Sequence, residues 1–340
     1  MLPDGRRLGA HLGIGDGMVK AADRAAEIGA AALQVFSDNP TAWHRRAEPS
    51  PEILAFRSSL EANDVAPLVI HASYLINLAG SDPTFHARSV ELLAAELDAA
   101  RRFGARIVNV HVGSHRGSGP EAGIERLASG IAAALAADDA ERVGAVAPDD
   151  EGMGRSGSIG PVIALENSSG GGWGLGVDLP EWVAIAGGLE AAGVPTDRLA
   201  FCLDLAHLWA AGIDVGTPAV IDDLVAAFDG ELGIERLALI HLNDTKSELG
   251  SRMDRHEHLG AGRIGPDGLG HVLRHERLRG ATYILETPGM EEGYDAVNLA
   301  RAEALARGEP LEPLPPEAFA LRRRRSHATA DEPVPASTTT

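Results

Sequence analysis

The chain has 340 residues and a mass of 35.5 kDa, and its 44% hydrophobic and 23% charged residues exclude a chain that is disordered throughout. Its formal net charge of -19, from 30 basic and 49 acidic residues, argues against a nucleic-acid partner, because an acidic protein repels the phosphate backbone. No apolar run reaches the roughly 20 residues that a membrane helix needs. The opening MLPDGRRLGAHLGIG lacks the apolar stretch of a secretory signal, and the single cysteine cannot form an internal disulfide, so we expect a cytoplasmic protein without a membrane partner.

Eight short runs rich in apolar and β-branched residues alternate with amphipathic, Ala-rich segments. In chain order the runs are LGAHLGI from Leu8, AALQVFS from Ala31, PLVIHA from Pro67, IVNVHV from Ile107, VIALEN from Val162, LAFCLDLA from Leu199, LALIHLND from Leu237 and TYILET from Thr282. The intervening segments repeat apolar residues at helical spacing, as in VELLAAELDAARRF from Val90. Strands that alternate with helices are typical of a parallel sheet, and eight of them favour closure. We therefore expect a single (β/α)8 TIM barrel over residues 1–305.

Two segments depart from this alternation. Residues 138–160 are rich in Gly, Asp and Ser, and we interpret them as an inserted flexible loop before the fifth strand. Residues 306–340 are dominated by Pro, Arg and Thr without apolar periodicity, which predicts a disordered tail.

The polar residues of the eight runs gather at the strand ends. In a (β/α)8 barrel the carboxyl ends of the strands converge on one face, where functional groups lie. Six consecutive runs each bring one residue of a metal-ligating type to that end, namely His71, His111, Glu166, Asp204, His241 and Glu286. Any one of them could cap a loop or face water, but six in succession have a single explanation in a metal cluster at the barrel mouth.

Three further residues extend the set: His207 in DLAHLWAAG, and Asp254 with His256 in MDRHEHLGAG. Taken alone, the second segment could equally be an exposed charged turn. A carboxylate such as Glu166 can neutralise and space two neighbouring cations, which an all-His site could not do. Mixed His and carboxylate ligands suit Zn²⁺ first and permit Mn²⁺ at some positions.

These residues resemble the signature blocks of the endonuclease IV family, zinc-dependent apurinic/apyrimidinic endonucleases. The blocks occur in family order as HASYLINL, HVGSH, LENSSGGG, DLAHLWAAGID, HLNDTK, MDRHEHLGAG and ILETP, between about His11 and Pro288. The resemblance implies three zinc ions per chain. It assigns the first to His71, His111 and Glu166, the second to Glu166, Asp204, His241 and Glu286, and the third to His207, Asp254 and His256.

The resemblance also implies an activity. The expected enzyme hydrolyses the phosphodiester bond 5′ to an abasic site in duplex DNA and leaves a 3′-hydroxyl and a 5′-deoxyribose phosphate, with Glu286 and Glu166 as catalytic residues. Its partner would be double-stranded DNA with abasic or 3′-blocked lesions, and the chain is expected to be a monomer. Tyr74 matches a residue that the family inserts into DNA, whereas Thr41 stands where the family has an inserted arginine.

Other interpretations stay open. A xylose-isomerase-like sugar isomerase or epimerase shares this architecture, although such sites give no reason for all of the histidines. A catalytically idle damage-binding relative would also fit the acidic charge and Thr41. Cys202, inside an apolar strand, is better explained as a packed core thiol than as a nucleophile. His11 and His115 could line the site or be ordinary hydrogen-bonded histidines.

Overall fold

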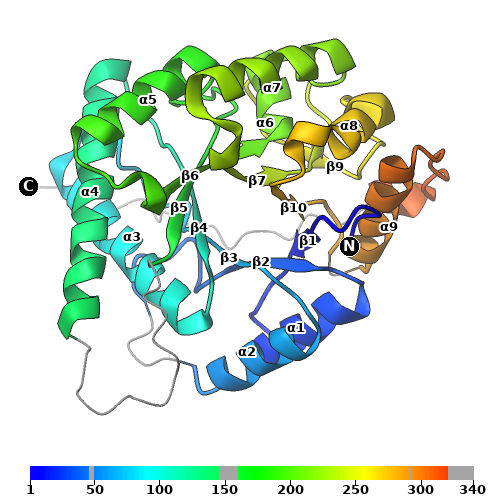
Figure 1. Ribbon diagram of the computed structural model, residues 1–340, viewed down its shortest axis with the longest axis horizontal. Coiled ribbons are helices and arrows are strands. Elements are labelled where there is room, and N and C mark those ends of the chain that lie inside the picture. Colours follow the sequence, from blue (N-terminus) through cyan, green and yellow to red (C-terminus); the bar gives the residue numbers. More distant parts are fainter. Residues whose placement is uncertain (46–49, 145–159, 291, 321–340) are drawn as a thin grey trace, which may run out of the picture.

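The computed structural model describes residues 1–45, 50–144, 160–290 and 292–320. Eight parallel strands close into a barrel in the order β1-β10-β7-β6-β5-β4-β3-β2, and helices surround it (Figure 1). The strands are β1 (Leu8–His11), β2 (Ala32–Phe36), β3 (Leu68–His71), β4 (Ile107–His111), β5 (Val162–Glu166), β6 (Leu199–Asp204), β7 (Leu237–His241) and β10 (Thr282–Leu285). Each of the eight predicted runs contains one of these strands, so the expected TIM barrel is confirmed.

Burial on both faces explains why these runs form the barrel wall. All six residues of β6 are buried, and β2 is buried from Ala32 to Val35. Parallel strands that are covered by helices on one side and by the barrel interior on the other read as nearly continuous apolar runs. The backbone of β2 lies very close to Gly9 of β1, because a Cβ at Gly9 would lie 2.0 Å from the carbonyl oxygen of Ala32. The seam between β1 and β2 therefore requires a residue without a side chain.

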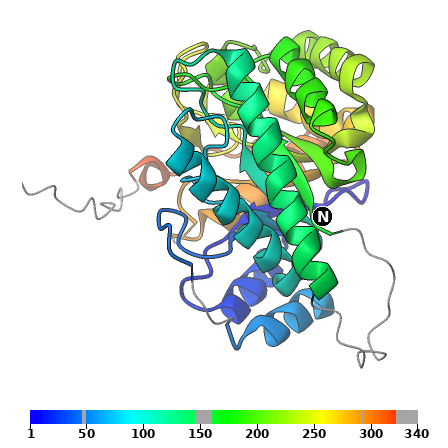
Figure 2. The ribbon, with the colours of Figure 1, turned by 90° about the vertical axis from the view of Figure 1, so that its left-hand side faces the viewer.

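The outer layer consists of helices that follow the strands. They are α1 (Met18–Glu27), α2 (Ile53–Ala62), α3 (Pro83–Phe103), α4 (Pro120–Gly144), α5 (Leu179–Ala191), α6 (Leu205–Ala211), α7 (Pro218–Leu232), α8 (Gly265–Arg274) and α9 (Tyr294–Arg307). The two longest, α3 and α4, run side by side along the barrel (Figure 2). Within the described ranges, no helix is both long and apolar enough to cross a membrane.

Capping residues set where α3 begins and ends. The Asp82 carboxylate accepts hydrogen bonds from the backbone N–H groups of Thr84 and Phe85, and Pro83 occupies the first turn, where its missing N–H costs nothing. Gly104 ends the helix in the left-handed conformation at φ 79°.

A small hairpin follows β7 at the barrel mouth. Strands β8 (Asp244–Thr245) and β9 (His256–Glu257) pair antiparallel. The buried Asp244 carboxylate accepts hydrogen bonds from the backbone N–H groups of Gly262 (2.9 Å) and Ile264 (3.0 Å), which fixes the chain beyond the hairpin. Residues 246–255, which connect the two strands, are thereby held close to the end of β7.

The predicted inserted loop over 138–160 begins too early. Residues 138–144 continue α4, and residues 145–159 lie outside the described residues. The Asp138 carboxylate is buried and forms ion pairs with Arg101 and with Arg198, at 2.7 Å for the latter. These long-range contacts, which composition does not reveal, tie the last turns of the helix to the amino end of the barrel.

The predicted tail also begins too early. Helix α9 runs to Arg307, residues 308–320 pack back onto the barrel and include a 3-10 turn at Pro316–Phe319, and residues 321–340 lie outside the described residues. Arg301 donates to the carbonyl oxygen of Glu312 at 2.6 Å, and Nε2 of His258 lies 2.9 Å from the carbonyl oxygen of Ala318. Arg301 and His258 are both buried, so the segment that they hold belongs to the folded domain.

Candidate metal centre

The barrel brings the six strand-end residues to one place. Five of them are the last residue of their strand, and Glu286 follows β10 directly. Register explains the convergence, because β4 pairs with β5 at His111 and Glu166 and β6 pairs with β7 at Asp204 and His241. The ends of these two pairs are level, whereas β4 extends two residues beyond β3 and β6 two residues beyond β5, so all six residues still lie at the mouth of the barrel.

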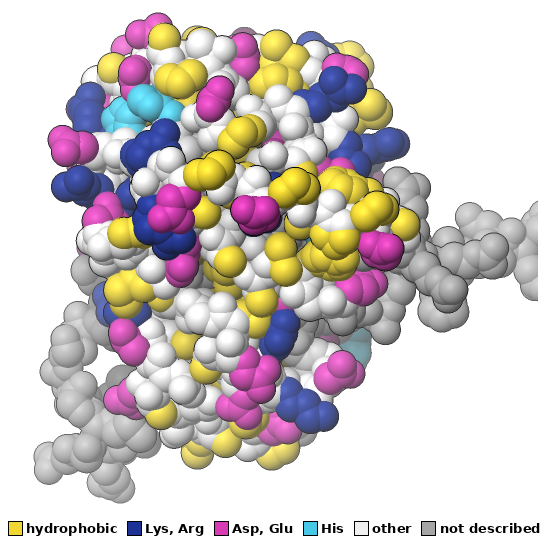
Figure 3. Space-filling model, turned by 90° about the vertical axis from the view of Figure 1, so that its right-hand side faces the viewer, with side chains coloured by type: hydrophobic (Ala, Val, Ile, Leu, Met, Phe, Trp, Pro, Cys, Tyr) yellow, Lys and Arg dark blue, Asp and Glu magenta, His cyan; other side chains and the backbone are white. Residues whose placement is uncertain are grey.

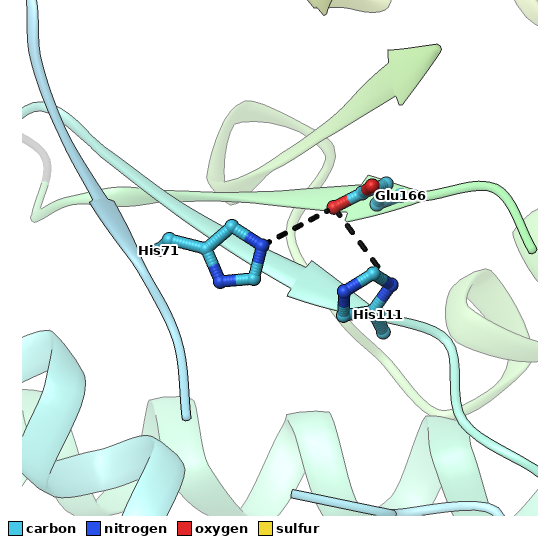
Figure 4. Close-up of side chains that lie close together, drawn as sticks. All are labelled: His71, His111 and Glu166. Atoms are coloured by element: carbon cyan, nitrogen blue, oxygen red, sulfur yellow. Dashed lines mark ion pairs between the residues drawn. The ribbon is translucent and has the colours of Figure 1, made fainter. Parts of the chain in front are cut away.

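The first group of ligand-type side chains is drawn in Figure 4. His71, His111 and Glu166 point toward one another from β3, β4 and β5. Nε2 of His71 lies 3.6 Å and Nδ1 of His111 lies 3.8 Å from Oε2 of Glu166. One ligand atom from each residue lies within 4.8 Å of the other two, which is close enough to share a metal ion.

The other oxygen of Glu166 faces a second set of side chains. Oε1 lies 3.2 Å from Nδ1 of His207 and 3.3 Å from Nδ1 of His241. Nδ1 of His241 also lies 3.3 Å from Glu286 and 3.8 Å from Asp204. The buried Glu166 carboxylate thus stands between two groups of ligands, as a bridging ligand must.

The hairpin supplies the rest of the third group. Nε2 of His207 lies 3.2 Å from Oδ2 of Asp254, and Nε2 of His256 lies 3.0 Å from Oδ1 of the same carboxylate. Asp204, His207 and His256 also bring ligand atoms within 4.8 Å of one another. All nine residues singled out from the sequence as ligands therefore lie in one contiguous cluster.

Hydrogen bonds orient the imidazole rings of this cluster. Nδ1 of His71 donates to the carbonyl oxygen of Ala72 (2.8 Å), and Nδ1 of His256 donates to that of Glu286 (2.8 Å). Because a neutral imidazole carries one proton, these acceptors fix the tautomer and leave each Nε2 lone pair directed at the carboxylates. Nε2 of His241 contacts Oε1 of Gln34 at 3.1 Å, which in the same way leaves Nδ1 for the cluster.

Two of the freed nitrogens have no hydrogen-bond partner. Nδ1 of His241 and Nε2 of His256 are buried without one among the described residues. A buried ring nitrogen without a hydrogen bond is costly unless it binds a proton or a cation that the neighbouring carboxylates stabilise. Carboxylates surround both atoms, so a cation fits the gap and a further hydrogen-bond acceptor does not. The donor set of histidines and carboxylates suits zinc.

The electrostatics of the cluster point the same way. Burial alone would lower the pKa of His256, but the Asp254 and Asp204 carboxylates raise it to about 9. Burial lowers the pKa of His241, but the neighbouring Cys202, Glu286 and Glu166 hold it well above its ordinary value. Burial raises but the surrounding histidines lower the pKa of Glu166, and the net result lies well below its ordinary value. The negative charge of the carboxylates thus favours positive charge at the histidines, whether from protons or from metal.

Sequence reasoning missed the amide side chains that orient the carboxylates. Asn109 donates to Oε2 of Glu166 (2.6 Å), and Asn243 donates to Oδ2 of Asp204 (2.7 Å) and Oε2 of Glu286 (3.2 Å). Further amide contacts come from Asn167 to the backbone of Asp204 and from Gln34 to Oε1 of Glu286. Gln34 and Asn109 were visible as polar residues within otherwise apolar strands, which is the signal that could have found them.

The structure places His11, His115 and Cys202, whose roles the sequence left open. His11 lies at the cluster, with Nδ1 3.5 Å from Glu286, and burial lowers its pKa. His115 lies away from the ligands and packs against Trp173 at 5.5 Å between ring centroids. Cys202 is fully buried and burial raises the pKa of its thiol to about 12, which agrees with a core thiol.

The loops beyond β2 and β3 form the rim of the mouth. The side chain of Tyr74 is 58% exposed, and its ring lies 5.6 Å from that of His71. Thr41 is held by Asn39, whose Oδ1 accepts from the Thr41 backbone N–H (3.0 Å) and hydroxyl (2.9 Å). Arg45, four residues further on, turns inward and pairs with Glu96 at 2.5 Å. Thr41 carries no charge, and the guanidinium of Arg45 is paired with Glu96 and does not project from this rim.

Comparisons with known proteins agree on one relationship. The family described as xylose isomerase-like TIM barrel matches residues 22–308. Probable endonuclease 4 of Methanoculleus marisnigri is 35% identical over 88% of this chain and 98% of its own length, and that of Haloarcula marismortui is 34% identical over 89% and 99%. The crystal structure of endonuclease IV from Thermus thermophilus superposes with a TM-score of 0.72 at 35% identity, covering 89% of this chain and 99% of that one.

Proposed function

This chain belongs to the endonuclease IV family, and on that premise we propose that it is a DNA-repair endonuclease with a trinuclear zinc centre. Its reaction would be hydrolysis of the phosphodiester bond 5′ to an abasic site in duplex DNA. The products would be a 3′-hydroxyl and a 5′-deoxyribose phosphate. Duplex DNA with a blocked 3′ end would be a second substrate.

One observation carries this proposal. The buried Nδ1 of His241 and Nε2 of His256 face carboxylates and lack a hydrogen-bond partner among the described residues, while the opposite nitrogen of each ring is already bonded. Such an arrangement is ready for cations and is poorly suited to an apolar or purely structural site.

The proposed ligand groups are those that the family resemblance implies, and the distances are compatible with them. His71, His111 and Glu166 would hold one zinc ion, Glu166, Asp204, His241 and Glu286 a second, and His207, Asp254 and His256 a third. When bound, zinc supplies Lewis acidity that lowers the pKa of a water molecule and offsets the charge that develops on phosphate oxygens. Mn²⁺ could replace zinc at positions with several oxygen ligands.

Two carboxylates would act directly in the reaction. Glu286 is 17% exposed, and Gln34 and Asn243 donate to its two oxygens, so its carboxylate is fixed at the edge of the cluster that faces solvent. Burial raises the pKa of Glu286, but His241 and other neighbours lower it by more, and the net result lies below its ordinary value. The carboxylate therefore stays ionised and can accept a proton from the attacking water. Glu166 lies deeper, where its charge keeps the two ligand groups together.

A DNA duplex would have to approach an acidic protein. On the side of the molecule drawn in Figure 3, acidic and basic side chains are intermixed, which agrees with the acidic total charge. Cations held at the mouth would reduce the local negative charge and so favour the approach of a phosphate backbone. Tyr74 at the rim would then contact the DNA beside the lesion.

Incision of a duplex with one synthetic abasic site tests the proposal. We expect cleavage 5′ to the lesion, loss of cleavage after prolonged chelation, recovery on adding zinc, and about three metal ions at the barrel mouth of each chain, as the three ligand groups predict. An undamaged duplex is the control substrate. Metal binding without incision would reject the endonuclease and lead to assays of sugar isomerisation and of binding to damaged DNA.

A further inference from the structure

A second group of metal-ligating side chains lies outside the barrel, between two helices of the outer layer. Asp222 belongs to α7, His271 to the last turn of α8, and His275 follows the end of α8. None of the three comes from a barrel strand, and none contacts the cluster at the mouth in the described contacts.

The three side chains converge on one carboxylate oxygen. Nε2 of His271 lies 2.6 Å and Nε2 of His275 lies 3.4 Å from Oδ1 of Asp222. Their ring centroids are 5.7 Å apart at an interplanar angle of 82°. One ligand atom from each residue lies within 4.8 Å of the other two, which is the same closeness that the groups at the barrel mouth show.

These distances suit zinc with small adjustments. Zinc bonds of about 2.0–2.1 Å at tetrahedral angles place ligand atoms about 3.3 Å apart. The separation between His275 and Asp222 is already close to this value, and the contact of His271 would need to open by less than about 1 Å. We propose that Asp222, His271 and His275 bind a zinc ion that links α7 to α8, with solvent at the remaining position.

His275 and Asp222 are in charge states that suit zinc, whereas Nε2 of His271, which contacts Asp222 at 2.6 Å, would have to give up its proton. Burial lowers the pKa of His275 and favours its neutral form, and the contact with His271 lowers the pKa of Asp222. Zinc at Nε2 of His275 requires a proton on Nδ1, which here accepts a hydrogen bond from the backbone N–H of Arg277 at 3.3 Å. That contact is at the long end of hydrogen-bond distances, so giving it up removes only a weak interaction.

A plain ion pair between the two helices is the alternative. It would need one protonated histidine beside Asp222, and the 2.6 Å contact of His271 satisfies it. It leaves His275 as a neutral ring whose Nε2–H faces the same oxygen at 3.4 Å, near the upper limit of hydrogen-bond distances. A cation shared by all three explains why both rings face Asp222.

Zinc titration of the intact protein distinguishes the two explanations. The proteins are the wild type, Asp222→Asn, His271→Ala and, as a matched control, Asp223→Asn, which changes the neighbouring exposed acid on the same helix. Zinc bound per chain is measured in competition with a chromophoric indicator of micromolar affinity, and circular dichroism verifies that each variant is folded.

We expect Asp222→Asn and His271→Ala to bind about one zinc ion fewer than the wild type, and Asp223→Asn to match it. Zinc should also raise the melting temperature of the wild type more than that of His271→Ala. Equal stoichiometry in all four folded proteins would overturn the site in favour of the ion pair. No DNA enters the measurement, so its outcome is independent of the endonuclease proposal.

Discussion

Nε2 of His241 lies 3.1 Å from Oε1 of Gln34, although 207 residues separate them along the chain. The same amide donates to Oε1 of Glu286 at 2.6 Å and contacts Nδ1 of His11 at 3.1 Å. Gln34 is fully buried, so its amide has one orientation and imposes one tautomer on His241.

Gln34→Met keeps the length of this side chain and removes its hydrogen bonds. We expect metal affinity at the barrel mouth to fall by about 10- to 100-fold, as is typical when a group that orients a metal-binding histidine is lost. Competition with a chelator measures the affinity. Unchanged affinity in a variant that circular dichroism shows to be folded would mean that the strand positions alone orient His241.

Zinc binding should release protons near neutral pH. The pKa of His256 is raised to about 9, above the 6.5 of an unperturbed histidine, so the metal-free side chain is protonated at pH 7.5. Zinc needs the neutral ring, and binding must displace that proton. Affinity should therefore rise with pH until about pH 9, where the competition from protons at His256 ends.

Calorimetry checks this prediction through the buffer. Titrations at pH 7.5 in two buffers of different ionisation enthalpy should give different heats, in proportion to the protons released. Identical heats would show that the metal-free histidines are already neutral. His111 would add nothing, because burial lowers its pKa to about 4.

Glu286→Gln should reduce incision of an abasic duplex by about 10²- to 10⁴-fold, the usual contribution of a positioned general base. The amide cannot accept a proton, although it keeps the shape of the side chain. Glu276→Gln, on the exposed surface before β10, is the matched control and should keep full activity. Because Glu286 is also a proposed ligand, metal content must be measured in both variants, and equal activity would remove Glu286 from the reaction.

Tyr74→Ala should weaken binding to an abasic duplex by about 1–3 kcal/mol, the range found for the loss of an aromatic contact with a base. The exposed ring packs edge-on against Phe36 at 5.2 Å and would meet the DNA at the rim. Tyr74→Phe keeps the ring and should bind like the wild type. Fluorescence anisotropy with labelled duplex gives both affinities, and equal values for all three proteins would exclude the contact.

Gly9→Ala should lower the free energy of unfolding by more than about 2 kcal/mol, because the new methyl group would meet backbone at the seam between β1 and β2. Gly187→Ala is a control that should change the free energy of unfolding in the opposite direction. It lies on the exposed side of α5 with open space around it, and it should stabilise the protein by about 0.5–1 kcal/mol. Urea unfolding measures both, and a neutral Gly9→Ala would show that the two strands can move apart.

The barrel and the positions of its ligands could be predicted because both are periodic. Apolar runs of strand length alternate with helical patterns, and a ligand-type residue ends six successive runs, from His71 to Glu286. Parallel strands then bring those ends to one face. The segment that carries Asp254 and His256 was predicted to lie at the site from its residue types, the company of the other ligands and its resemblance to a family block.

The remaining features depend on contacts across the fold. Gln34 and Asn109 orient ligands on other strands. A single amide inside a strand forms no repeating pattern in the sequence, so this role could not be predicted from spacing. Residues 306–320 have the composition of a tail, but His258 contacts the Ala318 carbonyl, and that partner is 60 residues away. Local composition describes solubility and flexibility better than it describes such anchoring.

The distribution of ligands over the ends of six strands and a hairpin has a consequence for assembly. A chain that has formed only part of the ring, or that has paired two strands one residue out of register, carries the same residues without bringing them together. The ligand strands run from β3 to β10 around the ring, and β1 and β2 close it between the two ends of this set, so the centre is completed only when the ring has closed in the right register. Metal occupancy therefore reports that the barrel has closed correctly, and a misassembled chain would be distinguishable as one that cannot retain its ions.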